Sequence, residues 1–109
     1  MMQAVPDQLE FMTTMQLTDQ IDYRPEKFNS KVLFREDDFN IILFALLQGQ
    51  EIPGHKTPRN AYLQCLEGEV TVSIGGVTFA LEKGGIIQLP KEIMHGMKAI
   101  LNTKLLLMK

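Results

Sequence analysis

The chain has 109 residues, of which 45% are hydrophobic and 22% are charged, and its formal net charge is −2 at pH 7. This balance predicts one folded domain and excludes a largely disordered chain. No cluster of Lys and Arg is present, and the longest apolar run, Ile41 to Leu47, is far too short to cross a membrane. We therefore expect neither a nucleic-acid partner nor a membrane partner.

Residues 1–28 differ in pattern from the rest and are predicted to form an N-terminal extension. They hold one candidate short helix, Pro6–Met12, because Pro is favoured in the first turn of a helix. Tyr23-Arg24-Pro25 is predicted to be extended. The first residues lack the basic start and apolar segment of a secretory signal. Because the single Cys65 cannot form an internal disulfide, we expect a cytoplasmic protein.

Residues 29–109 alternate between short apolar runs and turn residues, which predicts an all-β sandwich or barrel of antiparallel strands. Phe39–Gln48 is long and apolar and is expected to be a central strand that is buried on both faces. Gly49–Gly54 contains Pro53 and is predicted to be a loop, whereas Gly75-Gly76 is predicted to form a two-residue hairpin turn. Strands are predicted at residues 31–35, 39–48, 60–67, 69–74, 77–82, 86–89, 93–100 and 103–108.

Two motifs in this region carry a resemblance to a known family. The first reads G-x5-H-x-T-x3-A-x6-G over residues 49–68, and the second reads G-x5-P-x4-H over residues 84–95. In this order, and separated by a Gly-Gly hairpin, they resemble the two motifs of the cupin family. The resemblance implies a cupin-like double-stranded antiparallel β-barrel, or jelly roll, over residues 29–109.

The departures from the family motifs bear on a metal site. In the metal-binding members, three His and one Glu hold the ion. This chain matches that set at His55 and His95, but has Thr57 in place of the second His and Ala61 in place of the Glu. The Gly that follows the Pro of the second motif is Glu92 here. The resemblance thus implies a reduced site at His55 and His95 for a divalent transition metal (Zn, Ni, Fe or Mn) that is weakly bound or absent.

Strand side chains alternate between two faces, so residues two positions from the motif residues are expected to share a pocket with the two His. We expect this pocket to be apolar, with one hydroxyl and two sulfur atoms. Cys65 and Met97 would offer soft ligands for copper, although both residue types usually act as apolar core. A lone inward His is also usually a core residue, but both His of this chain fall at motif positions. The predicted lining is Thr57, Ala61, Leu63, Cys65, Ile93 and Met97.

Three functions remain open at this point. The leading hypothesis is a small-molecule-binding single-domain cupin of unknown specific role with a reduced metal site. The alternative is a metal-dependent enzyme (an isomerase, lyase or dioxygenase) that uses His55 and His95. The third is a purely structural dimer module. The fold hosts many chemistries and cannot decide among them.

A homodimer is predicted from apolar residues that the core does not account for. Leu105–Met108 is apolar at consecutive positions, so both faces of this strand are expected to be buried. One face would meet the core and the other a second subunit, with Phe11 and Met12 joining the interface.

Overall fold

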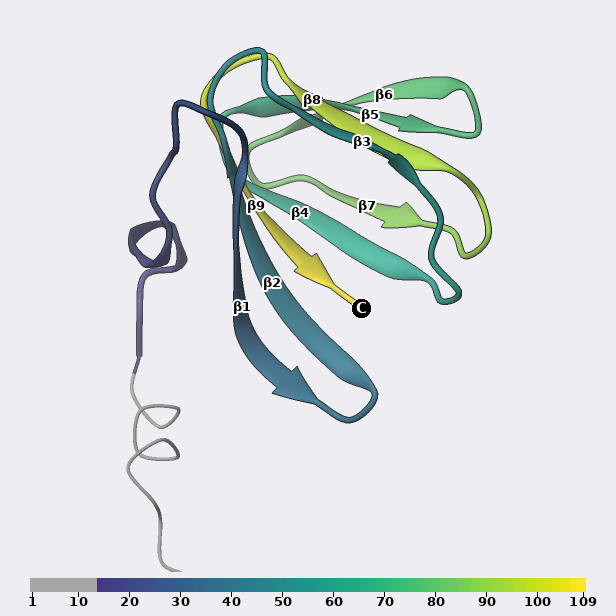
Figure 1. Ribbon diagram of the computed structural model, residues 1–109, viewed down its shortest axis with the longest axis horizontal. Coiled ribbons are helices and arrows are strands. Elements are labelled where there is room, and N and C mark those ends of the chain that lie inside the picture. Colours follow the sequence, from purple (N-terminus) through teal and green to yellow (C-terminus); the bar gives the residue numbers. More distant parts are fainter. Residues whose placement is uncertain (1–13) are drawn as a thin grey trace, which may run out of the picture.

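The computed structural model describes residues 14–109, and this part of the chain is almost entirely β-structure (Figure 1). The short 3-10 helix η1 (Leu17–Gln20) precedes the strands. Among these residues, no helix is long and apolar enough to span a membrane. The candidate helix at Pro6–Met12, with Phe11 and Met12, lies outside the described residues. The strands are β1 (Asn29–Glu36), β2 (Phe39–Leu46), β3 (Glu51–His55), β4 (Ala61–Glu67), β5 (Glu69–Ile74), β6 (Val77–Glu82), β7 (Ile86–Leu89), β8 (His95–Ala99) and β9 (Thr103–Met108).

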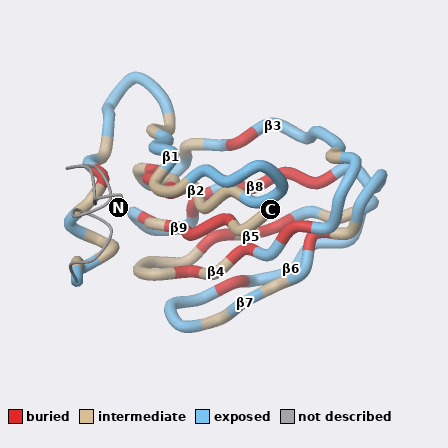
Figure 2. Tube along the Cα trace, turned by 90° about the horizontal axis from the view of Figure 1, so that it is seen from below, coloured by how far each residue is buried: buried red, intermediate tan, exposed pale blue. Residues whose placement is uncertain are grey.

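The strands form two antiparallel sheets, which confirms the predicted all-β fold. One sheet has the order β1-β2-β9-β4-β7, and the other has the order β3-β8-β5-β6. Their inner faces meet in one apolar core, in which Leu63, Val72 and Leu105 are fully buried. Figure 2 shows the buried positions running along β4, β5, β8 and β9, between more exposed edge strands. All eight predicted strands are present, with ends that differ by at most two residues.

One predicted loop is wrong. A loop was expected at residues 49–54, but residues 51–55 form strand β3 at the edge of the four-stranded sheet. Pro53 concealed this strand because Pro lacks the N–H that a ladder requires. Sheets tolerate Pro at edges and at bulges, and β3 offers both, since its register with β8 shifts between Ile52 and His55.

The outer face of the five-stranded sheet carries a second apolar cluster. Its buried members are Leu43, Ala45 and Leu106 from the sheet and Ile21 from the segment before β1. The hydroxyl of Tyr23 holds this segment in place by donating to the Glu67 carboxylate at 2.6 Å. The chain's own N-terminal segment therefore covers part of the face for which a second subunit is expected, and the homodimer stays a prediction.

The two ends of the barrel differ, and the register of the strands defines them. At one end, here called the mouth, β2 begins, β9 ends, and loops 56–60 and 90–94 lead into β4 and β8. At the far end, residues 100–102 join β8 to β9, and Gly68 lies between β4 and β5. The motif residues at positions 55 and 95 both belong to the mouth.

Candidate functional site

A bulge in β3 turns His55 toward the barrel interior. Ile52 pairs with Met97 and His55 pairs with His95, so β3 advances three residues where β8 advances two. Ile52 is buried and faces inward. Without the extra residue, a side chain three positions later would face outward, because strand faces alternate. The structure thereby brings the two His together at the mouth, with ring centroids 4.5 Å apart and in edge-to-face contact.

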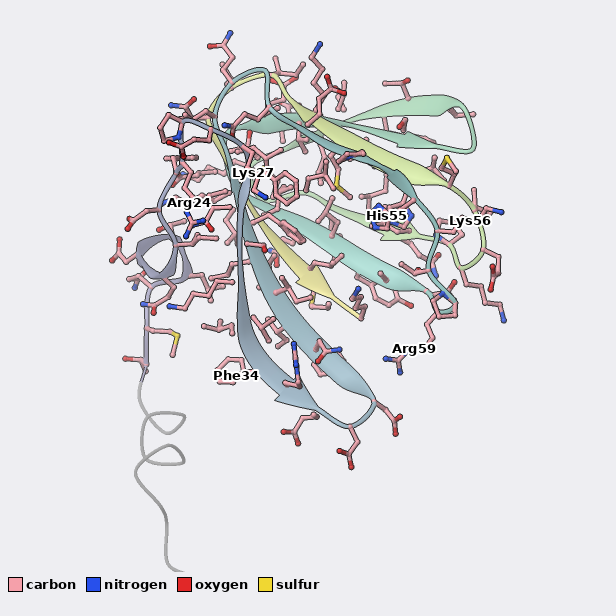
Figure 3. All side chains as sticks on the ribbon, in the orientation of Figure 1. Arg24, Lys27, Phe34, His55, Lys56 and Arg59 are labelled. Atoms are coloured by element: carbon pink, nitrogen blue, oxygen red, sulfur yellow. The ribbon has the colours of Figure 1, made fainter. Side chains whose placement is uncertain are left out.

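His55 keeps one ring nitrogen available for a ligand. Its Nδ1 lies 3.0 Å from the Pro53 carbonyl oxygen, and a carbonyl can only accept. Nδ1 therefore carries the proton in the neutral ring, and Nε2 presents a lone pair. His55 is exposed to solvent, and it lies at the end of β3 (Figure 3). This imidazole can accept a hydrogen bond from a small molecule that enters the mouth.

His95 is the buried member of the pair, with 2% of its surface exposed. Burial lowers the pKa of His95 below its ordinary value, and the neighbouring His55 lowers it further. The backbone of Ile93 partly opposes this shift, and the charge of Lys109 adds to it. Nδ1 of His95 is buried and makes no hydrogen bond of good geometry among the described residues, although the Ile93 backbone interacts with the ring. Because a buried polar atom is rarely left unpaired, this ring is a candidate contact for a ligand.

Three predicted pocket residues from β4 belong to the core. Ala61, Leu63 and Cys65 are each 1% exposed or less and pack in the interior cluster with Met97. The Cys65 thiol donates to the Glu67 carbonyl at 3.4 Å, and burial raises its pKa to about 11. Ala61 lies at the mouth end of β4, whereas Cys65 lies toward the far end.

The other two predicted pocket residues lie in the rim loops, outside the strands. Thr57 is half-buried, and its Oγ1 donates to the Arg59 carbonyl at 2.7 Å. Ile93 precedes β8 and is 40% exposed, so the alternation of β8 does not place it beside His95. Its side chain lies close to Gly75 in the β5–β6 turn.

Two mouth residues escaped the sequence analysis, Asn40 and Lys109. Their backbones are joined by two hydrogen bonds, of 2.5 and 3.0 Å. Together with Thr57, Pro58 and Arg59 they line a hollow of about 240 Å³. The side-chain Oδ1 of Asn40 is buried and has no partner among the described residues. The alternation itself was the available signal, because Asn40 continues the inner face of β2 and Lys109 continues that of β9.

The rim of the mouth is held by hydrogen bonds between its two loops. The Glu92 N–H donates to the Thr57 carbonyl at 2.8 Å, and the Lys91 N–H donates to the Asn60 side chain at 2.8 Å. Glu92 has φ +62°, the left-handed region that favours glycine. This is the position at which the second cupin motif has Gly, so the backbone bend is kept although the side chain differs.

The residues at the mouth do not fit a resident metal ion. Among residues 14–109, no group of three or more His, Cys, Asp or Glu side chains could hold one. A catalytic zinc commonly takes three protein ligands, and non-haem iron commonly takes two His and a carboxylate. The mouth offers two imidazoles, and Ala61 stands where the family motif has its carboxylate.

A second hollow, of about 180 Å³, lies on the outer face of the four-stranded sheet. Gly54 and Gly96 are among its lining residues. Its hydroxyls are already used, because Thr71 donates to the Lys98 carbonyl and Ser73 donates to the Gly96 carbonyl. Unpaired buried polar atoms occur at the mouth and not here, which favours the mouth as the site.

Comparisons with known proteins support the fold. A family model described as a cupin domain matches residues 42–108. A conserved protein of unknown function from Streptococcus pyogenes is 28% identical, with 89% of this chain and 85% of that chain covered and a TM-score of 0.82. A protein from Thermus thermophilus is also 28% identical, with coverages of 89% and 95% and a TM-score of 0.81.

A cupin superfamily protein from Desulfitobacterium hafniense has a TM-score of 0.83 over 90% of each chain. At 18% identity it supports the fold alone. A search of curated proteins found no significant match.

Proposed function

The chain belongs to the cupin family, and from this premise we propose that it is a small-molecule-binding cupin whose ligand contacts His55 and His95 at the mouth. The observation that carries the proposal is the edge-to-face pair of imidazoles, 4.5 Å apart. One ring presents a free acceptor to solvent, and the other has a buried nitrogen without a partner. The two rings touch each other, so one small polar molecule at the mouth can contact both of them.

The same two imidazoles also support a second candidate function, a metal-dependent enzyme. Metal-ligating His side chains usually donate their second ring nitrogen to a carbonyl or carboxylate, and His55 donates to the Pro53 carbonyl in this way. A metal held by His55 and His95 alone would need water or substrate to complete its coordination. Since structural and catalytic sites usually draw on three or four protein ligands, binding should be weak.

Ligand-observed NMR with a panel of small acids, sugars and nucleosides tests the leading proposal. We expect at least one compound to show saturation transfer from the wild-type protein. This transfer should disappear with the His55→Ala variant and with the His95→Ala variant. Lys98→Ala, on the outer face of the four-stranded sheet, is the matched control and should keep the signal. A panel that gives no transfer with wild type, or the same transfer with both His variants, would refute the proposal.

Elemental analysis of protein purified without a metal-affinity tag separates the two candidates. The binding module predicts substoichiometric metal, whereas a stoichiometric transition metal would support the enzyme. Restoring the family set with Thr57→His and Ala61→Glu should raise zinc affinity by at least about tenfold, or ~1.4 kcal/mol, by titration calorimetry. Ala61 is buried, so thermal unfolding checks the fold, and Thr57→His alone supplies a milder variant. Unchanged zinc affinity in a folded double variant would contradict the assigned positions.

A further inference from the structure

The inner face of the four-stranded sheet carries one row of side chains across the mouth. His55 of β3 pairs with His95 of β8, and His95 pairs with Ile74 of β5. Ile74 in turn pairs with Val77 of β6. Directly paired residues present their side chains on the same face of a sheet, with Cβ atoms about 5 Å apart. The imidazole pair therefore continues without a break into apolar side chains of the β5–β6 hairpin.

The inward-facing side chains of β6 become more exposed toward the mouth. Val77, Phe79 and Leu81 share the inner face, because β6 keeps a regular register with β5 and strand side chains alternate. Leu81 belongs to the core and is 5% exposed, whereas Phe79 is 42% and Val77 is 56% exposed. Ile74, Val77 and Phe79, here called the hairpin face, thus present apolar surface beside the two imidazoles. Apolar surface that borders polar groups is typical of ligand-binding grooves.

The hairpin is tied to the rim of the mouth. Figure 1 shows the β5–β6 hairpin extending at the same end of the molecule as the ends of β3 and β7. The Gly75 N–H in its turn donates to the Met94 carbonyl of loop 90–94 at 2.9 Å. Ile93 of this loop is 40% exposed and lies close to Gly75. The mouth therefore has two chemically different parts, imidazoles on β3 and β8 and apolar side chains around the β5–β6 hairpin.

We propose that the mouth binds a small amphipathic alcohol, with its hydroxyl on the imidazole pair and its apolar body on the hairpin face. The inference rests on the proposed function, because it names the ligand class for the same mouth. His95 and Val77 lie two strands apart, which corresponds to ~10 Å. A molecule of that length contacts both parts at once. Its apolar body supplies affinity by leaving water, and its hydroxyl fixes the orientation.

Three alcohols with the same polar end test the apolar contact: 3-phenylpropan-1-ol, 3-cyclohexylpropan-1-ol and propan-1-ol. In an amide NMR titration, at least one ring-bearing alcohol should shift the signals of Ile74, Val77 and Phe79. It should bind about tenfold or more tightly than propan-1-ol. The tighter of the two ring-bearing alcohols identifies the body as aromatic or aliphatic. Equal affinity for all three alcohols, or no binding of either ring-bearing one, would overturn the proposal.

Two substitutions test the assigned side chains. Phe79→Ala removes the ring and should weaken binding of the tighter alcohol by about tenfold. Val77→Thr keeps a β-branched side chain that suits a strand, and should weaken it by about threefold even if Phe79→Ala unfolds. Ile86→Ala is the matched control, because Ile86 is 61% exposed but pairs with Gln64 on the outer face of the other sheet. Equal losses in Phe79→Ala and Ile86→Ala would mean non-specific binding, and the site would be wrong.

The His variants distinguish this inference from the proposed function. If His55→Ala weakens the ring-bearing alcohols and the two hairpin variants do not, the imidazole site stands and the hairpin face is wrong. If the hairpin variants weaken them and both His variants do not, the proposed function fails instead. Analytical ultracentrifugation tests the other occupant, a second copy of the chain. A dimer that Phe79→Ala dissociates, with the affinity for alcohols unchanged, would make the hairpin face a subunit interface and overturn the proposal.

Discussion

The mouth and the far end of the barrel are built from the same strands but finished differently. On the inner face of β9, Thr103 at the far end is fully buried. Its Oγ1 accepts from the Glu69 N–H, and its one proton is shared between the carbonyls of Glu69 and Leu101. At the other end of that face lies the Lys109 cation. Among the described residues, the two buried side-chain atoms without a partner, Asn40 Oδ1 and His95 Nδ1, both lie at the mouth. The inward-facing positions thus hold a hydrogen-bonded polar side chain at the far end and buried polar atoms without partners at the mouth.

The largest expected effect comes from disturbing the far end. Gly68 has φ +83°, and a Cβ there would lie 2.1 Å from the Asn102 carbonyl oxygen and 2.7 Å from Thr103 Oγ1. Gly68→Ala should lower the free energy of unfolding by at least about 2 kcal/mol, through backbone strain and this clash. Denaturant unfolding measures the change.

Gly76→Ala is the matched control for Gly68→Ala. Gly76 has nearly the same φ, +86°, but nothing lies within 4 Å of its added Cβ. It should cost about 1 kcal/mol, the strain alone. Equal losses in the two variants would show that the tight packing around residue 68 contributes nothing.

At the mouth, the opposite sign is expected for Glu92→Gly. Glu92 occupies the left-handed region with φ +62°, where a side chain costs about 1 kcal/mol. Removing the side chain should raise the unfolding free energy by up to ~1 kcal/mol. Gly68→Ala, in contrast, should lower it. Glu92→Ala keeps the Cβ and removes the carboxylate, so a similar gain in that variant would assign the effect to charge.

A smaller effect should appear in the pH dependence of stability. Because the pKa of His95 is lowered in the folded state, the unfolded chain takes up this proton first as the pH falls. His95 therefore contributes stability above its ordinary pKa of about 6.5, and this contribution is lost as the pH falls below that value. His95→Gln should flatten the decline in unfolding free energy between pH 7 and pH 5.

His55→Gln is the control for this pH dependence. Burial is the larger cause of the His95 shift and His55 the smaller, so this variant should retain most of the decline. If His55→Gln flattened the curve as much as His95→Gln, the assignment to the buried ring would fail.

The sequence predicted the strands, the all-β fold and the two motif His, because alternation and turn residues are local signals. It could not place β3, since Pro53 contradicts a strand unless the strand is known to be an edge. The bulge that turns His55 inward also depends on the partner strand. Alternation could have placed Asn40 and Lys109 on inner faces, but only the pairing of β2 with β9 brings them together.

The most direct measurement of the central claim is a ring-nitrogen NMR titration of His55 and His95 with the panel compound that gives the strongest saturation transfer. We expect both ring signals to shift together with one binding curve, while the amides of Cys65 and Val70 at the far end stay unchanged. Shifts at Thr71 and Ser73 on the outer face, with both imidazole signals unmoved, would contradict a ligand site at the mouth.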